Sequence, residues 1–116
     1  MTDKPKFIKL PYYPDDRGIL TVAEAQRHIP FEIKRVFWIT DVPTGATRAG
    51  HSHALCHQVL VTITGTVAVK IENGIFILHN PANALYIPPN NYIELTRFSK
   101  DAVLLVLCSH YYDEED

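Results

Sequence analysis

The sequence predicts an all-β fold of the sandwich or barrel type. Apolar and polar residues alternate along short segments, so the apolar period is two far more often than the helical value of about 3.6. Turn signals rich in Gly, Pro, Asn and Asp separate these segments at intervals of roughly 8–12 residues. Strands do not alternate with helical segments, which argues against a parallel α/β architecture. Short strands at such spacing are typical of β-sandwiches and β-barrels.

The central strands are the clearest expected elements. Residues 59–63 and 67–71 both show the alternation of half-buried strands, and Gly65 lies in the turn between them. An Asn-Gly pair at 73–74 precedes the apolar run 75–78, which predicts a β-hairpin. Further strands are expected at 19–22, 33–40, 85–87, 92–97 and 102–109, for roughly nine in all.

Three segments depart from this alternation. Residues 22–28 are predicted to have helical character, and Pro30 would end such a helix. Residues 103–107 are apolar at every position, so this strand is expected to be covered on both faces, with another subunit as one source of cover. The acidic tail 113–116 is expected to be a solvated, frayed end.

Length and composition limit the class of protein. The 116 residues, 47% of them hydrophobic and 21% charged, indicate one globular domain. No apolar run is long enough for a membrane-spanning helix, and the polar N-terminus lacks a signal peptide, so we expect a cytoplasmic protein without a membrane partner. A net charge of −2 gives no broad basic field for nucleic acid. Cys56 and Cys108 are expected to be reduced, buried apolar residues.

Two neighbouring histidines carry the strongest chemical signal. His51 and His53 follow a Gly-rich turn within the segment 45–58. On a strand, residues two apart point to the same face, so their imidazoles are expected to lie together. Such a pair can ligate a metal, or it can act as a base and its neighbour in proton transfer near neutral pH.

The spacing of this segment resembles the first sequence motif of the cupins. Gly45, His51, His53 and Gly65 fit that motif, and Gln58 stands where glutamate is usual. The resemblance implies a cupin fold, the double-stranded β-helix or jelly-roll barrel, with residues 1–116 as a single domain.

The second cupin motif supplies a further histidine, but this chain has Ile93 at that position. Two histidines and a neutral amide are a weak donor set for zinc, iron or nickel. His57 would add a third imidazole only if the chain bent suitably after His53. The residues therefore favour a site without metal.

A narrower resemblance spans nearly the whole chain. The sequence is similar to the cupin-fold dTDP-4-keto-6-deoxyglucose 3,4-ketoisomerases, which make sugar precursors for bacterial surface polysaccharides. The resemblance implies a metal-independent isomerase without a cofactor, a dTDP-hexose substrate, and homodimers with exchanged N-terminal strands. The matching segments are Asp16-Arg17-Gly18, 29–31, 33–35, Arg48 with His51-Ser52-His53, 58–61, Gly65, 85–87, 103–107 and 111–114.

This family's reaction moves a ketone from C4 to C3, which needs a base for the C3 proton and an acid that returns a proton at C4. The resemblance assigns His51 as the principal base and His53 as its partner or the reprotonating group. Arginine can stabilise the enediolate oxygen or hold the pyrophosphate. The expected substrate contacts are Arg48 first, then Arg17, which strand exchange would bring to the partner's site, and Arg35, Gln58 and Tyr92.

Three departures from the family pattern keep alternatives open. Phe37-Trp38 replaces a common tyrosine, Ala54 replaces a lysine, and Ile93 replaces a histidine. Water or another tyrosine, such as Tyr86, could replace the missing proton donors. The alternatives to the isomerase are a noncatalytic sugar-nucleotide-binding cupin and a small metal-dependent cupin enzyme.

Overall fold

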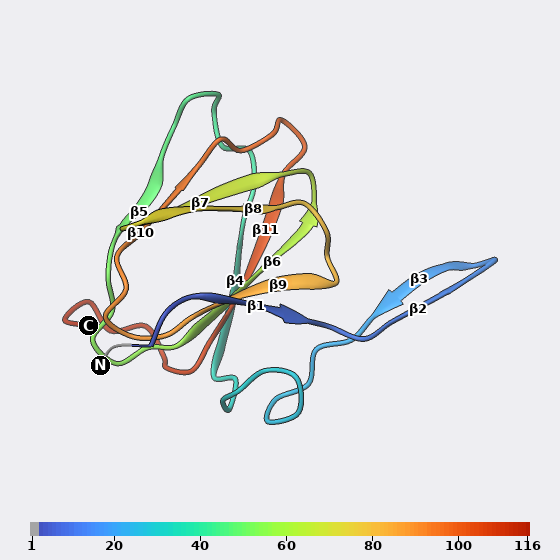
Figure 1. Cartoon of the computed structure of the whole chain (residues 1–116), viewed down its shortest axis with the longest axis horizontal. Coiled ribbons are helices and arrows are strands. Elements are labelled where there is room, and N and C mark those ends of the chain that lie inside the picture. The colour runs from blue at the N-terminus through green and yellow to red at the C-terminus, as the bar shows by residue number, and fades with distance from the viewer. Residues whose placement is uncertain (1–2) are drawn as a thin grey trace.

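The protein is built from β-strands, as the sequence predicts. The computed structural model describes residues 3–116, and these form eleven strands and no helix (Figure 1). The strands are β1 (Lys6–Lys9), β2 (Tyr12–Asp15), β3 (Gly18–Thr21), β4 (Arg35–Ile39), β5 (Arg48–His51), β6 (Gln58–Thr64), β7 (Val67–Ile71), β8 (Gly74–Leu78), β9 (Asn83–Ile87), β10 (Ile93–Thr96) and β11 (Val103–Cys108).

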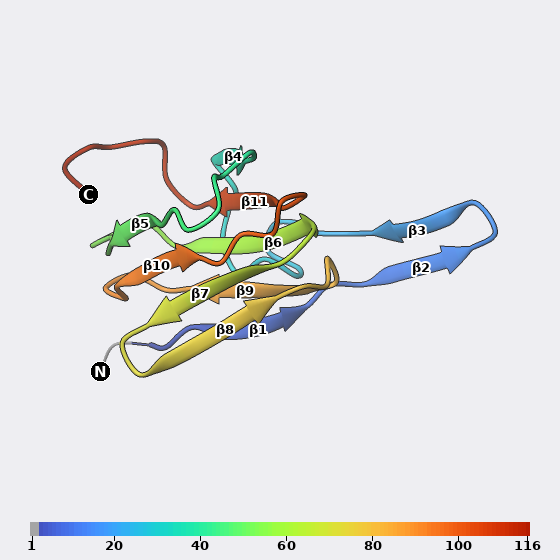
Figure 2. The same cartoon turned by 90° about the horizontal axis from the view of Figure 1, so that it is seen from above.

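The strands form two main antiparallel sheets and a separate hairpin. The larger sheet has the order β1-β9-β6-β11-β4, and the smaller has the order β5-β10-β7-β8. Alternate residues of both sheets point into one shared core, so the sheets pack face to face (Figure 2). This core contains Leu60, Leu85 and Leu104 from the larger sheet, with Val69 and Leu95 from the smaller.

A second apolar cluster covers the outer face of the larger sheet. Ile29 and Phe31 come from the connection between β3 and β4, and they pack with Val59, Val61 and Leu107. β11 therefore lies between two apolar clusters, so the predicted cover of residues 103–107 is present on the inner face and only partial on the outer face, where Leu107 is buried but Val103 is half-buried. Both layers of cover come from this chain, although Leu105 stays half-buried.

The helical character expected for residues 22–28 is wrong. This segment forms a turn, with an isolated bridge between Ala25 and Ile29, and Gln26 has a φ of 66°. A left-handed backbone residue interrupts a right-handed helix. Burial of Ile29, which is 1% exposed, in the outer cluster decides the path of the chain here.

The strands expected from alternation and turn signals are present. The Asn-Gly hairpin is β7–β8, in which Ile71 pairs with Gly74 across a two-residue turn. β1, β2 and β5 lie outside the strand ranges that the sequence predicts; all residues of β2 and β5 are exposed, so no burial pattern marks those two strands. Among the described residues, no helix has the length and apolarity needed to cross a membrane.

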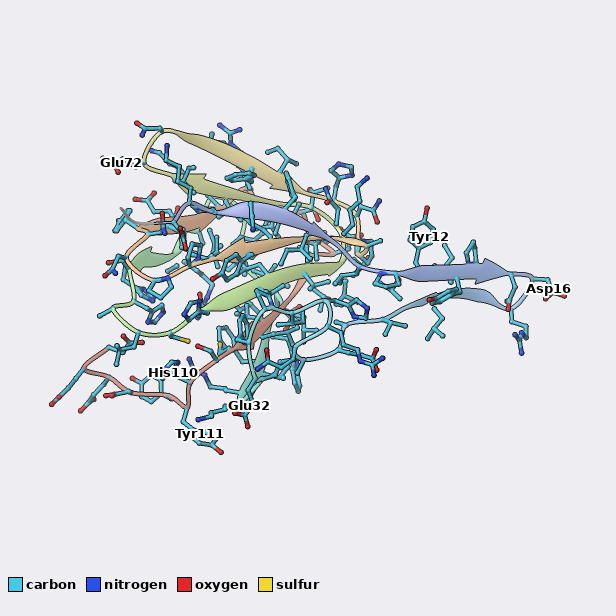
Figure 3. All side chains as sticks on the ribbon, turned by 60° about the horizontal axis from the view of Figure 1, so that its bottom comes forward. Tyr12, Asp16, Glu32, Glu72, His110 and Tyr111 are labelled. Carbon is cyan, nitrogen blue, oxygen red and sulfur yellow. The ribbon has the colours of Figure 1, made fainter. Side chains whose placement is uncertain are left out.

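The hairpin of β2 and β3 extends away from the two main sheets (Figures 1 and 3). It exposes four large apolar side chains, with Tyr12 at 55%, Tyr13 at 60%, Ile19 at 68% and Leu20 at 64%. An isolated two-stranded hairpin is marginally stable in water. Its apolar surface is therefore unusually large for an element with so little support from the rest of the chain.

Candidate active site

A cavity of about 420 Å³ opens at the end of the two sheets where β5 and the C-terminal segment lie. Its apolar part comes from both sheets: Phe37, Ile39, Leu60, Ile87, Ile93, Leu95 and Val106. Its polar part includes Arg35, Arg48, His51, His53, Gln58, Asp113 and Asp116. The cavity thus combines an apolar wall with a small set of convergent polar groups, which is the usual composition of a small-molecule site.

His51 and His53 meet at this cavity. Their Nε2 atoms are 3.0 Å apart, and their rings are nearly perpendicular, at 89°. A hydrogen bond between two ring nitrogens requires that one donates and the other accepts. The two imidazoles therefore share a single proton between their facing nitrogens, which confirms that they lie together.

The imidazoles of His51 and His53 are not brought together by alternation along a single strand. His51 ends β5, whereas His53 lies in the loop that follows. Gly50 has a φ of 75°, and the pairing of β5 with β10 shifts register between Ile93 and Glu94. Such a bulge changes the direction of the strand and of its side chains. The His53 carbonyl accepts a hydrogen bond from the Asn90 backbone N–H at 2.7 Å, which ties this loop to the β9–β10 connection.

No metal-binding cluster forms around the pair within residues 3–116: no three His, Cys, Asp or Glu side chains come close enough to hold an ion. Ile93, which replaces the usual cupin histidine, pairs with His51 across the strands and is 5% exposed. His57 does not line the cavity. Its Nδ1 lies 2.7 Å from the Tyr86 hydroxyl, and the two rings are stacked at an interplanar angle of 7°.

Tyr86 is consequently poorly placed as a replacement proton donor. It does not line the cavity and packs against the outer apolar cluster. Burial, with a smaller contribution from the Asp3 carboxylate, raises the pKa of the Tyr86 phenol. The phenol therefore stays protonated and serves as a partner of His57.

Three of the predicted substrate contacts line the cavity. Arg35 lies at the start of β4, with its guanidinium carbon 5.5 Å from the centre of the Phe37 ring and 5.7 Å from that of Tyr112. Its Nε is buried and has no hydrogen-bond partner among the described residues. Arg48 is exposed at the start of β5, and the Gln58 amide is buried, with its Nε2 donating to Cys108 Sγ at 3.7 Å.

The other two predicted contacts lie outside the cavity of this chain. Arg17 is at the tip of the β2–β3 hairpin, where its side chain is 86% exposed and forms a 2.7 Å ion pair with Asp15. Tyr92 is half-exposed, and its hydroxyl donates to Glu94 at 3.0 Å. That hydrogen bond is the main reason that the pKa of the Tyr92 phenol is raised. Neither residue contributes to the cavity wall.

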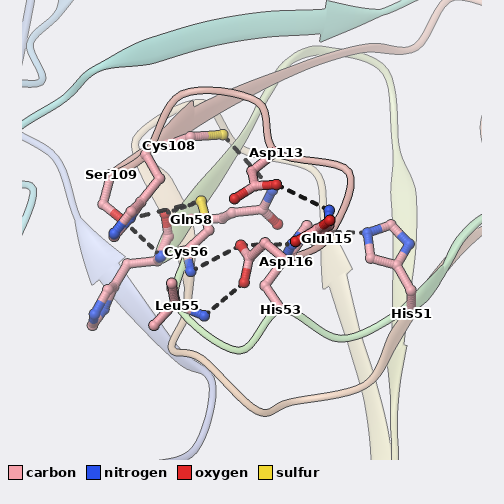
Figure 4. Close-up of polar contacts among 12 residues, drawn as sticks. His51, His53, Leu55, Cys56, Gln58, Cys108, Ser109, Asp113, Glu115 and Asp116 are labelled. Atoms are coloured by element: carbon pink, nitrogen blue, oxygen red, sulfur yellow. Dashed lines mark hydrogen bonds and ion pairs between the residues drawn. The ribbon is translucent and has the colours of Figure 1, made fainter.

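The acidic tail is only partly the solvated, frayed end that the sequence predicts: residues 113–115 are exposed, but Asp116 is not. The tail returns to the cavity, and the Asp116 side chain is only 7% exposed (Figure 4). Its Oδ1 accepts from the Leu55 N–H at 2.8 Å, and its Oδ2 accepts from the Cys56 N–H at 3.2 Å. Oδ2 also lies 3.3 Å from His53 Nδ1. Sequence reasoning missed Asp116 because a run of four acidic residues at a chain end is usually solvated.

The two cysteines lie beside the same site. Both are buried and unpaired, as expected, and Cys56 lines the cavity. The neighbouring Cys56 thiol, together with burial, raises the pKa of Cys108. Cys108 therefore remains a neutral thiol and acts as a small buried residue under Gln58.

Comparison with known proteins is consistent with this geometry. A family model described as WxcM-like, C-terminal (FdtA) matches residues 3–116. A relative from Aneurinibacillus thermoaerophilus, named TDP-4-oxo-6-deoxy-alpha-D-glucose-3,4-oxoisomerase, is 42% identical over 106 residues, which are 88% of this chain and 76% of the relative. The chain belongs to this family. The resemblance to the 3,4-ketoisomerases predicted from sequence motifs is therefore confirmed.

Solved structures of FdtA-like enzymes superpose closely on the chain. A mutant of the 3,4-ketoisomerase QdtA from Thermoanaerobacterium thermosaccharolyticum, in complex with TDP-4-keto-6-deoxyglucose, has a TM-score of 0.93 and 42% identity, covering 100% of this chain and 87% of that one. The TDP-quinovose 3,4-ketoisomerase WlaRB from Campylobacter jejuni has a TM-score of 0.90 and 35% identity, covering 95% and 88%.

A more distant protein shares the fold alone. The dTDP-6-deoxy-D-glucose-3,5-epimerase RmlC from Legionella pneumophila has a TM-score of 0.80 at 18% identity, covering 96% of this chain and 69% of its own. The prediction of a cupin-like jelly-roll barrel is confirmed by these neighbours together with the two packed antiparallel sheets.

Proposed function

We infer that this protein is a sugar-nucleotide 3,4-ketoisomerase that acts on TDP-4-keto-6-deoxyglucose in deoxysugar biosynthesis. The observation that carries this conclusion is the 42% identity to a TDP-4-oxo-6-deoxy-glucose 3,4-oxoisomerase over 88% of the chain. The pair of imidazoles at the cavity supports it, because the reaction consists of proton transfers. The enzyme is an isomerase, so the product has the same atoms as the substrate.

The reaction requires one proton transfer from C3, one proton transfer to C4, and the movement of a proton between the two oxygens. A base removes the proton from C3, and the electrons of the C3–H bond form a C3–C4 double bond while the C4 carbonyl oxygen takes a proton. The resulting enediol then loses the proton of its C3 hydroxyl as C4 receives a proton, which leaves the ketone at C3. Each step needs an acid or a base that changes protonation near neutral pH, as imidazole does.

We propose that His51 and His53 carry these protons. His51 is the more exposed of the two and is assigned as the base, and His53 is assigned as its partner. The 3.0 Å contact between their Nε2 atoms supports this assignment, since a proton gained by one ring can pass to the other. The apolar wall that includes Leu60, Ile93 and Leu95 supports it further, because exclusion of water strengthens electrostatic stabilisation of an enediolate.

We propose that Arg48, Arg35 and Gln58 bind the substrate. Arg48 has an exposed guanidinium on the cavity wall, suited to the enediolate oxygen or a phosphate. Arg35 has a buried Nε without a hydrogen-bond partner among residues 3–116, and this N–H is available to an anionic ligand. Gln58 can hydrogen-bond a sugar oxygen from the inner end of β6.

Deuterium incorporation tests the function and the assigned base together. In D2O, the wild-type protein is expected to exchange the C3 proton of TDP-4-keto-6-deoxyglucose and to form the 3-keto product, both followed by proton NMR. His51→Asn is expected to lower the exchange rate by about 100-fold or more, the usual range for a general base. His79→Asn, which changes an exposed histidine on the β8–β9 connection, is the matched control and should exchange normally.

Two results would contradict the proposed function, and a third would contradict the assignment of His51 as the base. Substrate binding without exchange by the wild-type protein would indicate the noncatalytic alternative. Activity that disappears on treatment with a chelator and returns with added metal would indicate the metal-dependent alternative. Full exchange by His51→Asn would leave the function intact but remove His51 as the base.

We propose that the single cupin domain of residues 1–116 forms a homodimer in which N-terminal strands are exchanged. The projecting β2–β3 hairpin supports this, because its Ile19 and Leu20 are left exposed by the residues that the structure describes. β4 is an edge strand of the larger sheet, and its Val36 and Trp38 are 45% and 66% exposed. In such a dimer the hairpin tip would carry Arg17 to the partner's cavity, where its guanidinium would meet the bound nucleotide or sugar.

We also propose that the enzyme works in the cytoplasm. The described cysteines, Cys56 and Cys108, are both free and buried, which suits a reducing compartment.

A further inference from the structure

We propose that Asp116 is a positioning residue for the ketoisomerase reaction: its carboxylate orients His53 and stabilises the proton that His53 receives from His51. This inference rests on the proposed function of the histidine pair. The carboxylate, His53 and His51 lie in one line of contacts, with 3.3 Å from Oδ2 to His53 Nδ1 and 3.0 Å from His53 Nε2 to His51 Nε2 (Figure 4).

The carboxylate is held in place by the backbone. The N–H groups of Leu55 and Cys56 donate one to each oxygen of Asp116, at 2.8 and 3.2 Å. Burial raises the pKa of this carboxyl, but the hydrogen bond from Leu55, the charge of His53 and the hydrogen bond from Cys56 together hold the pKa below its usual value. Asp116 is therefore a fixed anion rather than a mobile surface charge.

The contact with His53 is electrostatic. The Nδ1 atom is buried and makes no aligned hydrogen bond among the described residues, yet it lies 3.3 Å from Oδ2. A carboxylate this close favours a proton on Nδ1 and a positive charge on the ring. A small movement of the side chain would complete a hydrogen bond, and such bonds often tighten when substrate is bound.

This arrangement gives the two histidines different roles. When His51 takes the C3 proton on one ring nitrogen, it can release its Nε2 proton to His53 Nε2, so that His51 returns to the neutral state. His53 then carries protons on both ring nitrogens and faces Asp116, which stabilises the imidazolium. The proton returns by the same path when C4 is protonated.

Other charged groups surround the cavity, but Asp116 and His51 are the ones in direct contact with His53 among the described residues. The remaining titratable or charged groups on the cavity wall are Arg35, Arg48, Cys56, Tyr111, Tyr112 and Asp113. The two arginines oppose a positive charge on His53, whereas Asp113 is a further carboxylate on the same cavity wall. Asp116 is thus the carboxylate in contact with His53 that can offset the repulsion between the two arginines and a positive charge on His53.

The test compares Asp116→Asn with Asp116→Glu across pH. Asparagine keeps the size of the side chain and removes the charge, so kcat is expected to fall by roughly tenfold to 100-fold, by analogy with the loss of a carboxylate partner from a metal-bound histidine. Because the protonated pair is then less stable, both limbs of the pH–rate profile are expected to move to lower pH, with KM nearly unchanged. Asp116→Glu should keep the wild-type position of the profile.

Glu115→Gln is the matched control, since it removes one negative charge from an exposed neighbouring position of the same tail. It should leave the profile in place. A loss of kcat by Asp116→Asn without displacement of the profile, or a rise in KM alone, would show that Asp116 only anchors the tail and would overturn the proposal.

A second measurement is independent of catalysis. Imidazole 15N NMR of the substrate-free protein is expected to show a proton on His53 Nδ1 and a smaller imidazolium population in Asp116→Asn at the same pH. Identical His53 signals in the two proteins would overturn the positioning role. If the wild-type protein fails to exchange the C3 proton, the proposed function fails, and these signals still decide the role of Asp116.

Discussion

His51 and His53 form a proton-sharing pair because only one hydrogen fits between ring nitrogens 3.0 Å apart. Ile93 lies opposite His51 and offers no electron pair, so the neighbouring strand adds hydrocarbon where a metal site would need a donor. At the scale of residues, the surroundings of the histidine pair thus differ from the cupin pattern at Ile93 and include the Asp116 carboxylate.

Replacing Ile93 with histidine tests how close the site is to a metal centre. Ile93→His adds a third imidazole beside His51 on the cavity wall, so we expect zinc to bind roughly tenfold more tightly or better, about 1.4 kcal/mol. Bound zinc would occupy the imidazole electron pairs and inhibit C3 exchange. Isothermal titration calorimetry with zinc measures the first effect. Ile77→His, on an exposed face of β8, is the control and should bind zinc like the wild-type protein.

At the scale of elements, the position of each site group follows from strand pairing. Gln58 and Cys108 pair at the matching ends of β6 and β11, which brings the amide to the inner wall of the cavity. The turn at Gly65 joins β6 of the larger sheet to β7 of the smaller sheet. A Cβ at Gly65 would lie 2.7 Å from the Ala102 Cα, so the turn packs directly against the segment before β11.

A substitution in this turn should affect stability rather than chemistry. Gly65 has a φ of 77°, and its added methyl would meet backbone atoms that cannot easily move. We expect Gly65→Ala to reduce the free energy of unfolding by about 1–3 kcal/mol or more, measured by urea denaturation. Gly74→Ala is the control, because Gly74 has open space around its Cα and no positive φ, and its effect should stay within about 0.5 kcal/mol. Equal effects of the two substitutions would contradict this explanation.

At the scale of the whole molecule, the histidine pair and Arg17, which are both expected to act on the substrate, lie in different parts of one chain. The cavity and its histidine pair lie at the β5 end of the two sheets, whereas Arg17 lies at the tip of the β2–β3 hairpin. This hairpin projects from the sheets on the side away from β5 (Figure 2). The exposed apolar side chains of this hairpin and of β4 suit the exchange of hairpins between two copies. A site completed by a partner's Arg17 would make dimerisation a condition of activity.

Mixing two inactive variants tests this arrangement. If Arg17 of one copy serves the cavity of the other, Arg17→Ala and His51→Asn should each lose activity, and mixed dimers should hold one complete site. Random mixing places one complete site in half of the dimers, so activity should recover to roughly a quarter of the wild-type level. Refolding the variants together measures this, with light scattering to confirm the dimer mass. No recovery from a mixture of confirmed dimers would show that Arg17 does not act across subunits.

Much of this protein could be predicted from its sequence because the relevant signals are local. The strands around the core follow from apolar alternation and turn residues, and the His-X-His segment after a Gly-rich turn marks the two histidines as a candidate site, although a bulge rather than strand alternation brings their rings together. Local pattern predicts helical character for residues 22–28, but the path of this connection depends on the burial of Ile29 in a distant cluster. β5 has no burial pattern of its own and exists through its pairing with β10.

Local pattern therefore determined the all-β class, the central hairpins, the family and the two imidazoles. The tertiary structure alone decided that a bulge beside Ile93 directs His51 toward His53, that Tyr92 lies outside the cavity, and that the acidic tail returns to His53. The physical reason is that these features depend on contacts between segments distant in sequence. Asp116 and the backbone of Leu55 are 61 residues apart, and only folding brings a carboxylate to the N–H groups that hold it.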